Sequence, residues 1–119
     1  MRFRGTLVRP LADQADLDGN FIDPAGVEFT NPVTVFVEFD YRNPVGRAVV
    51  SRAPDGSLVA EGELGIDKPA GLRIAAGVAS LGDLKRTQGG RVISACRLNA
   101  IGLTPNHSDP GQPEIEEVP

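Results

Sequence analysis

The chain of 119 residues is poor in aromatic side chains, with no Trp, one Tyr and five Phe. Aliphatic residues, mainly Val and Leu, must therefore fill its core. It also has one Cys and one His. A single cysteine excludes an internal disulfide, and one Cys with one His cannot complete a structural zinc site. We therefore predict a fold without metal or cofactor, suited to a reducing compartment.

The sequence also lacks long apolar runs. None approaches the roughly 20 residues that cross a bilayer, and the first ten residues, MRFRGTLVRP, lack the apolar core of a signal peptide. We therefore expect a protein that is made in the cytoplasm and has no membrane partner.

An excess of positive charge is missing as well. All 12 Lys and Arg residues lie in residues 1–104, together with 12 of the 16 acidic residues. The other four acidic residues are Asp109, Glu114, Glu116 and Glu117. The body of the protein is thus neutral, and the net charge of −4 comes from its C-terminal end. Without a basic stripe or a run of exposed aromatics, nucleic acid is not expected as a partner.

What the sequence does have is a period of two. Apolar and polar residues alternate in 1–9, in 33–40 and in 58–64, and a further strand pattern runs from Gly46 to Arg52. Between the last two, Asp55-Gly56 favours the positive φ angles of a tight turn. These patterns predict half-buried strands and one well-defined hairpin.

The other segments give weaker patterns. Residues 11–32 predict a long irregular connection with a short strand at 20–22. A strand is expected near 72–79, at most one helical turn at 81–86, and a long strand after Gly89-Gly90, with a bend or bulge at Asn99 or Gly102. We predict an all-β, single-domain barrel or sandwich over residues 1–104, followed by an extended acidic tail over 105–119.

Catalytic residues are hard to find in this pattern. His107 and its neighbour Ser108 lie in the polar tail, where nothing predicts a third group to orient the imidazole. Cys96 lies inside an alternating strand and is expected to be a buried structural thiol. A dyad of His107 with Cys96 or Ser94 would require the tail to fold back.

The acidic loop near the N-terminus contains oxygen ligands of the kind found in calcium sites. Carboxylate and amide oxygens around Gly19 are the ligands that Ca²⁺ prefers. The candidates are Asp13, Asp16, Asp18, Asn20 and Asp23. Their spacing does not match the EF-hand loop and lacks its final Glu, so a turn-rich linker accounts for the same residues and no metal site is predicted.

The order of the segments resembles the prohead, or capsid maturation, proteases of tailed bacteriophages. The resemblance extends over nearly the whole chain and is carried by FRGTLV, DLDGNFIDPAG, PVTVFVEFDYRNPVGRAVV, DGSLVAEGEL, GLRIAAGVA and RVISACRLNAIGLTPNHSDPGQPEI. The resemblance implies a barrel like that of the proteases.

The resemblance also implies that catalysis has been lost. The family carries a catalytic His followed by Asp before a short turn and Pro-Ile-Gly, and here Phe39 precedes Asp40, YRN and Pro44-Val45-Gly46. The family nucleophile is a Ser in a Leu-Ser-Ile-Gly-like strand, where this chain has Arg73. The connection before that strand has also shrunk to GIDKPA. Because a nucleophile needs its general base within hydrogen-bond reach, losing both removes acyl transfer.

The resemblance therefore predicts a non-enzymatic virion protein that decorates or stabilises the capsid. Its expected partner is the major capsid protein, with self-association as a second option. We expect the capsid contacts in the loop 13–26 and in the tail. The candidates are Asp13, Asp16, Asp18, Asn20, Asp23, Asn106, His107, Asp109, Glu114 and Ile115. An active shortened protease and a head-tail or assembly adaptor are the alternatives.

Overall fold

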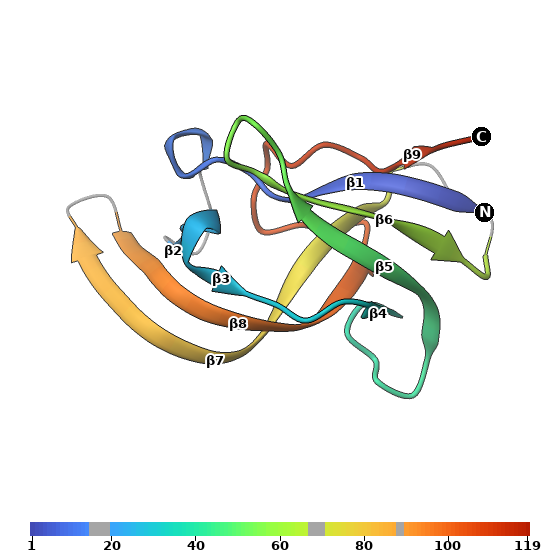
Figure 1. Ribbon diagram of the computed structural model, residues 1–119, viewed down its shortest axis with the longest axis horizontal. Coiled ribbons are helices and arrows are strands. Elements are labelled where there is room, and N and C mark those ends of the chain that lie inside the picture. Colours follow the sequence, from blue (N-terminus) through green and yellow to red (C-terminus); the bar gives the residue numbers. More distant parts are fainter. Residues whose placement is uncertain (15–19, 67–70, 88–89) are drawn as a thin grey trace.

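The described part of the chain folds almost entirely into β-strands (Figure 1). The computed structural model describes residues 1–14, 20–66, 71–87 and 90–119. The strands are β1 (Arg2–Val8), β2 (Asn20–Ile22), β3 (Val27–Glu28), β4 (Val33–Val37), β5 (Pro44–Arg52), β6 (Leu58–Leu64), β7 (Arg73–Thr87), β8 (Gly90–Thr104) and β9 (Glu116–Glu117). The predicted all-β class, a compact barrel-like or sandwich-like domain, is confirmed; the sheet is not closed.

Two 3-10 helices interrupt the strands, η1 (Leu11–Asp13) and η2 (Pro24–Gly26). The Asp23 carboxylate accepts a hydrogen bond from the Ala25 N–H and so caps η2, as short polar side chains do at helix starts. Among the described residues, neither helix has the length or the hydrophobicity needed to cross a membrane.

Strand β8 organises the sheet. Along one edge it pairs antiparallel with β7, and along the other it pairs in parallel with β2, β3 and β4 in turn. The sheet continues from β4 through β5, β6 and β1 to β9. The β7–β8 ladder contains register shifts, one of which places Asn99 as an extra residue between the partners of Gly77 and Val78. Such bulges bend a ribbon, and the paired strands curve around the molecule in Figure 1.

The core follows the predicted alternation. Phe3, Leu7, Leu58 and the other inward positions of β1 and β6 are buried, while the residues between them point outward. The turn after β5 has Gly56 at φ +92°, as Asp-Gly turns require. Phe3 is the one aromatic residue in the buried core, and Val, Leu and Ile fill most of the rest. The aliphatic core predicted from composition is therefore confirmed.

Two predicted strand ends are wrong. The strand expected near 72–79 does not end there, and no helical turn forms at 81–86, because β7 continues to Thr87 along its ladder with β8. The strand predicted for 33–40 ends at Val37, because Glu38 and Phe39 have positive φ angles of 47° and 60° and turn the chain. Pairing with β8 therefore keeps residues 81–86 extended. A turn made by two residues other than glycine ends β4.

The C-terminal segment 105–119 was expected to extend from the body as a tail. Instead it packs against the barrel, and we call it the C-terminal strap. Asp109, Gln112 and Ile115 are 7%, 2% and 1% exposed. The Ile115 N–H donates to the Leu72 carbonyl, and β9 pairs with β1. The strap thus bonds to β1 and to the start of β7, which lie close together without a ladder between them.

Candidate functional site

Phe39, which the resemblance places at the catalytic His position, lies in the turn between β4 and β5. Its ring covers the backbone of two glycines on β7 and β8. A Cβ built on Gly102 would approach the ring to 2.5 Å, and one built on Gly77 would approach it to 2.8 Å. Any larger residue there would displace the ring. Because these two residues have no side chains, they leave the space in which the Phe39 ring packs.

Arg73, at the suspected Ser position, begins β7. Its Nε donates to the Gln112 carbonyl at 2.6 Å, and an Nη donates to the Pro105 carbonyl at 3.4 Å. The guanidinium thus holds both ends of the first half of the strap. A guanidinium has only donors and no lone pair for attack, so Arg73 acts here as a structural cation.

The two positions come together on one face. Gly102, beneath the Phe39 ring, pairs with Ala75, two residues from Arg73 on the same strand. Residues two apart share a face and lie roughly 7 Å apart along a strand. The Phe39 ring thus covers a strand position near the one where Arg73 begins, and neither side chain can serve as a nucleophile or a general base.

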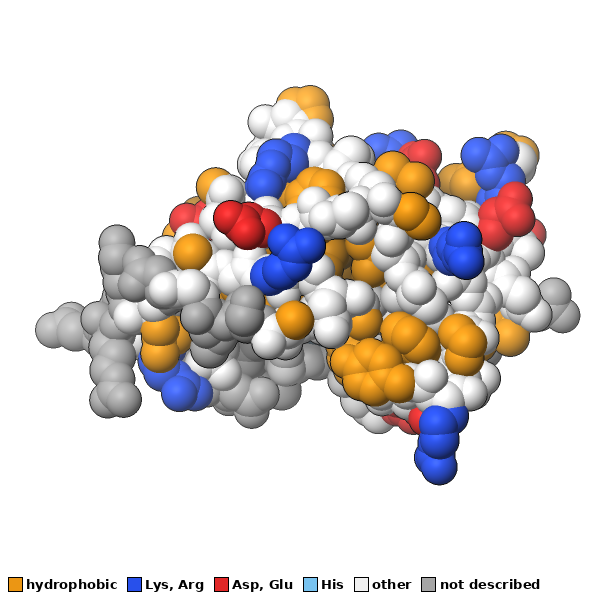
Figure 2. All heavy atoms as spheres, turned by 60° about the horizontal axis from the view of Figure 1, so that its bottom comes forward, with side chains coloured by type: hydrophobic (Ala, Val, Ile, Leu, Met, Phe, Trp, Pro, Cys, Tyr) orange, Lys and Arg blue, Asp and Glu red, His pale blue; other side chains and the backbone are white. Residues whose placement is uncertain are grey.

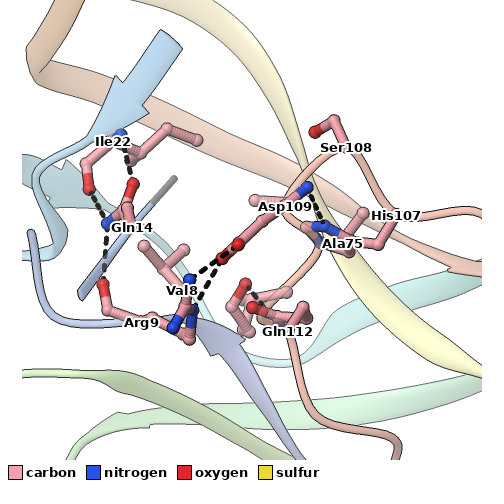
Figure 3. Close-up of a pocket in the computed structure, with 11 residues that line it drawn as sticks. Val8, Arg9, Gln14, Ile22, Ala75, His107, Ser108, Asp109 and Gln112 are labelled. Atoms are coloured by element: carbon pink, nitrogen blue, oxygen red, sulfur yellow. Dashed lines mark hydrogen bonds and ion pairs between the residues drawn. The ribbon is translucent and has the colours of Figure 1, made fainter. Parts of the chain in front are cut away.

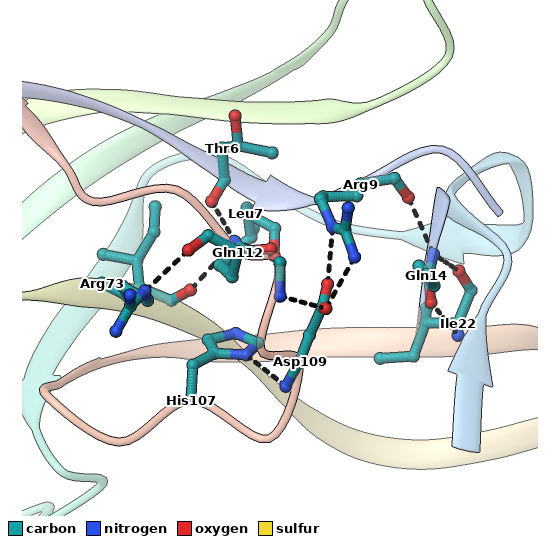
Figure 4. A network of polar contacts seen from close by, with 11 residues as sticks. Thr6, Leu7, Arg9, Gln14, Ile22, Arg73, His107, Asp109 and Gln112 are labelled. Atoms are coloured by element: carbon teal, nitrogen blue, oxygen red, sulfur yellow. Dashed lines mark hydrogen bonds and ion pairs between the residues drawn. The ribbon is translucent and has the colours of Figure 1, made fainter. Parts of the chain in front are cut away.

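A polar network next to this face fixes the strap to β1 (Figure 4). Arg9 donates from Nε and Nη2 to the two carboxylate oxygens of Asp109, each at 2.7 Å. The Gln112 side-chain amide donates to the carbonyl of Thr6, and at 3.3 Å to those of Leu7 and Ile74. These bonds join β1, β7 and the strap at the place where the sheet remains open.

The environment of Asp109 favours its charged form. Burial alone would raise the pKa of its carboxyl, but the Arg9 hydrogen bonds, the Gly111 N–H and the Arg9 charge outweigh burial and lower that pKa. In return, the hydrogen bonds that Arg9 donates to Asp109 raise the pKa of Arg9. Asp109 and Arg9 therefore form a bidentate ion pair of the kind that fixes geometry as well as charge.

A small pocket of about 90 Å³ opens beside this network (Figure 3). Leu7 and Ile22 are among its apolar side chains, and its polar ones are Arg9, Gln14, His107, Ser108, Asp109 and Gln112. The Gln14 side chain bonds the backbone of Arg9 and Ile22, so it serves to tie the ends of the linker together. A volume of this size suits a few water molecules.

His107 is the imidazole on which any catalytic alternative depends. Its Nδ1 accepts a hydrogen bond from the Asp109 backbone N–H at 2.9 Å, which orients the ring within the strap. The tail does fold back, as a dyad would require, but not toward Cys96. Cys96 lies on β8 five residues from Ile101, which pairs with Ala76 in the His107 pocket. That spacing corresponds to roughly 15 Å along a strand.

The thiol itself is also unsuited to nucleophilic attack. Burial raises the pKa of Cys96, which disfavours the reactive thiolate. Cys96 is 5% exposed and belongs to the core, as the sequence pattern predicted. The arrangement therefore gives no geometric support to a dyad of Cys96 and His107.

The loop candidates for capsid contact divide into three groups. Asp13 is exposed at the end of η1, whereas Asp23 caps η2 and Asn20 pairs with Arg91 in the sheet. Asp16 and Asp18 lie outside the described residues. Within the described ranges, no group of three or more His, Cys, Asp or Glu is arranged to hold a metal ion.

The tail candidates are likewise divided. Asn106 and Glu114 are exposed, while His107 is half-buried. Asp109 and Ile115 are buried by the strap's own packing, so neither presents its side chain to a partner in this conformation. Asp109 pairs with Arg9, and Ile115 lies against the position of Gly5 in the core.

Sequence reasoning missed the residues that hold the strap. Gln112 looked like one polar residue in a Pro- and Gly-rich end, and nothing in the local pattern links it to carbonyls of β1 more than 100 positions away. A signal for burial was nevertheless present, because Ile115 is an isolated large apolar residue among acidic ones. Such a residue in a polar tail indicates a docked segment.

We compared the chain with protein families, with curated proteins and with solved structures, and none of these comparisons gave a match. The fold and the geometry of the site therefore stand on the structure alone.

Proposed function

We propose that this chain is a non-enzymatic virion protein that binds the assembled shell of a tailed bacteriophage and stabilises it. The proposal begins from the resemblance to prohead proteases. In this proposed role the protein lies on the capsid surface as a decoration or minor capsid protein. Its partner is the major capsid protein.

One observation supports the non-enzymatic part above all others. The residues at the suspected His and Ser positions both have structural contacts: Phe39 covers Gly77 and Gly102, and Arg73 holds the strap. Restoring a His and a Ser would therefore disturb two packing arrangements. This is the pattern expected when a catalytic scaffold has been adapted to a structural role.

The test is the number of copies of this chain in purified particles, measured by quantitative mass spectrometry against the major capsid protein. A ratio near one per capsid subunit, or a simple fraction of it, is expected. A few copies per particle would instead indicate an adaptor. Absence from mature particles would contradict the proposal.

A second experiment addresses the enzymatic alternative. Purified protein is incubated with capsid and scaffolding proteins, and cleavage is followed by mass spectrometry, with Cys96→Ala and His107→Ala as controls. No cleavage above background is expected. Cleavage that either substitution abolishes would overturn the non-enzymatic assignment.

A further inference from the structure

The described surface has an uneven distribution of aromatic residues. Phe36, Phe39 and Tyr41, three of the six Phe and Tyr residues in the chain, lie within six positions of one another at the β4–β5 hairpin. We call them the aromatic cluster. Tyr41 is 60% exposed, the highest value among large hydrophobic residues of the described chain, and the two Phe residues are half-buried. Aromatic side chains with this exposure are typical of binding surfaces.

The three aromatic residues occupy neighbouring positions at the hairpin. The Phe36 and Tyr41 rings meet edge to face, with centroids 4.9 Å apart. Phe36 also pairs with Gly102 on the neighbouring strand, and Gly102 is the residue that the Phe39 ring covers. Adjacent strands lie about 4.8 Å apart, so the Phe39 ring lies beside Phe36. Figure 2 shows hydrophobic side chains gathered on the face that this hairpin occupies.

Arg42 supplies an exposed positive charge beside the aromatic cluster. Its side chain is 91% exposed, and its Nε contacts the Asp40 carboxylate at 3.1 Å. An exposed ion pair of this kind contributes little to folding stability, and the guanidinium retains donors for a partner. A complementary surface would therefore offer an apolar pocket for Tyr41 and a carboxylate near Arg42.

The size of the cluster argues against a stable dimer through this surface. Fully buried aromatic residues each contribute about 150–250 Å², and two of these three are already partly covered. The total stays below the roughly 800 Å² per partner of a standard interface. A contact of this size is weak for each copy. A lattice that repeats the site would therefore carry many weakly bound copies, each in exchange with free chain.

We infer that the aromatic cluster with Arg42 is the surface that docks on the capsid shell, in place of the acidic loop and the tail. This inference rests on the proposed function. The partner site is an apolar pocket bordered by a carboxylate, repeated on each major capsid subunit.

The experiment measures binding of the purified chain to empty shells assembled from the major capsid protein of the same phage. Tyr41→Ala is expected to lower the affinity about tenfold or more, as for a central aromatic contact. Arg42→Glu is expected to lower it as well. The control is Val49→Ala, which removes a side chain of similar exposure, 56%, on the outer face of β5. Unfolding in urea verifies that the variants remain folded.

The outcomes separate the two proposals. If the wild-type chain does not bind shells, the proposed function fails and the docking inference fails with it. If the wild type binds and Tyr41→Ala binds equally well, while charge reversal at Asp13 or Glu114 lowers affinity, only the docking inference is wrong. Sedimentation that shows self-association lost in Tyr41→Ala, with shell binding unchanged, would assign the cluster to a second copy and overturn the inference.

Discussion

At the scale of single residues, glycine determines where the Phe39 ring can lie. Gly102→Ala would place a methyl group 2.5 Å from the ring, so the ring must lift away from β8. We expect a loss of about 1–3 kcal/mol in the free energy of unfolding, measured in urea, as for other overpacked sites. Phe39 is only half-buried, so its ring has room to move, which favours the lower end of that range.

The matched control for Gly102 is Gly65→Ala. Its new Cβ would meet only the Val45 carbonyl, at the ordinary distance of 3.6 Å. We expect a change within about 0.5 kcal/mol. The substitution Phe39→Ala combined with Gly102→Ala should cost less than the sum of the two single changes, because the clash disappears with the ring. Additive losses would show that the ring does not contact Gly102.

The ion pair of Arg9 and Asp109 predicts a dependence of stability on pH. Burial opposes the charge of Asp109, but Arg9 outweighs it, and the carboxyl pKa in the folded protein lies below its ordinary value of 3.8. A lowered pKa contributes stability that is complete above the ordinary value and is lost as the pH falls through the folded one. The free energy of unfolding, measured between about pH 5 and pH 2, should therefore decline more steeply in the wild type than in Asp109→Asn. Parallel curves would contradict this assignment.

At the scale of elements, the strap joins β1 to β7 through one side chain. Gln112→Ala removes the amide that donates to the carbonyls of Thr6, Leu7 and Ile74. Because these buried acceptors lose a donor, we expect a loss of about 1–3 kcal/mol in the free energy of unfolding. Asn106→Ala, at an exposed position of the same strap, is the control and should be nearly neutral. Equal losses would mean that the Gln112 bonds do not stabilise the junction.

Elements differ in how well the sequence predicts them. Strands β1 and β6 follow the predicted alternation, and a strong turn signal precedes β6, so most of their buried positions could be predicted. The far half of β7 could not, because Gly82 and a mixed pattern suggest a break, and only the ladder with β8 keeps it extended. Local sequence pattern is therefore enough to predict the alternating strands. The extended conformation of the far half of β7 depends on pairing with a distant segment.

At the scale of the whole molecule, the candidate site also depends on contacts between distant segments, which the local sequence does not reveal. The sequence placed Cys96 in a buried strand and proposed Phe39 and Arg73 as replaced catalytic positions. It did not reveal that their contacts lie on Gly102 and on the strap, because both contacts depend on how the sheet curves. Composition correctly indicated an acidic C-terminal end, but charge alone says nothing about docking.

Removal of the strap tests whether residues 105–119 contribute to the stability of the fold. A chain that ends at Thr104 loses the buried Ile115, the Asp109 ion pair and the Gln112 bonds together, and it exposes the junction of β1 and β7. Burial of one large aliphatic side chain contributes about 1.5–3 kcal/mol, so the combined loss is on the order of 5 kcal/mol. That loss is comparable with the whole stability of a small domain. We therefore expect the truncated chain to unfold at much lower urea concentration or to lack a cooperative transition. An extended tail would instead leave the unfolding midpoint unchanged, and that result would show that the strap does not complete the barrel.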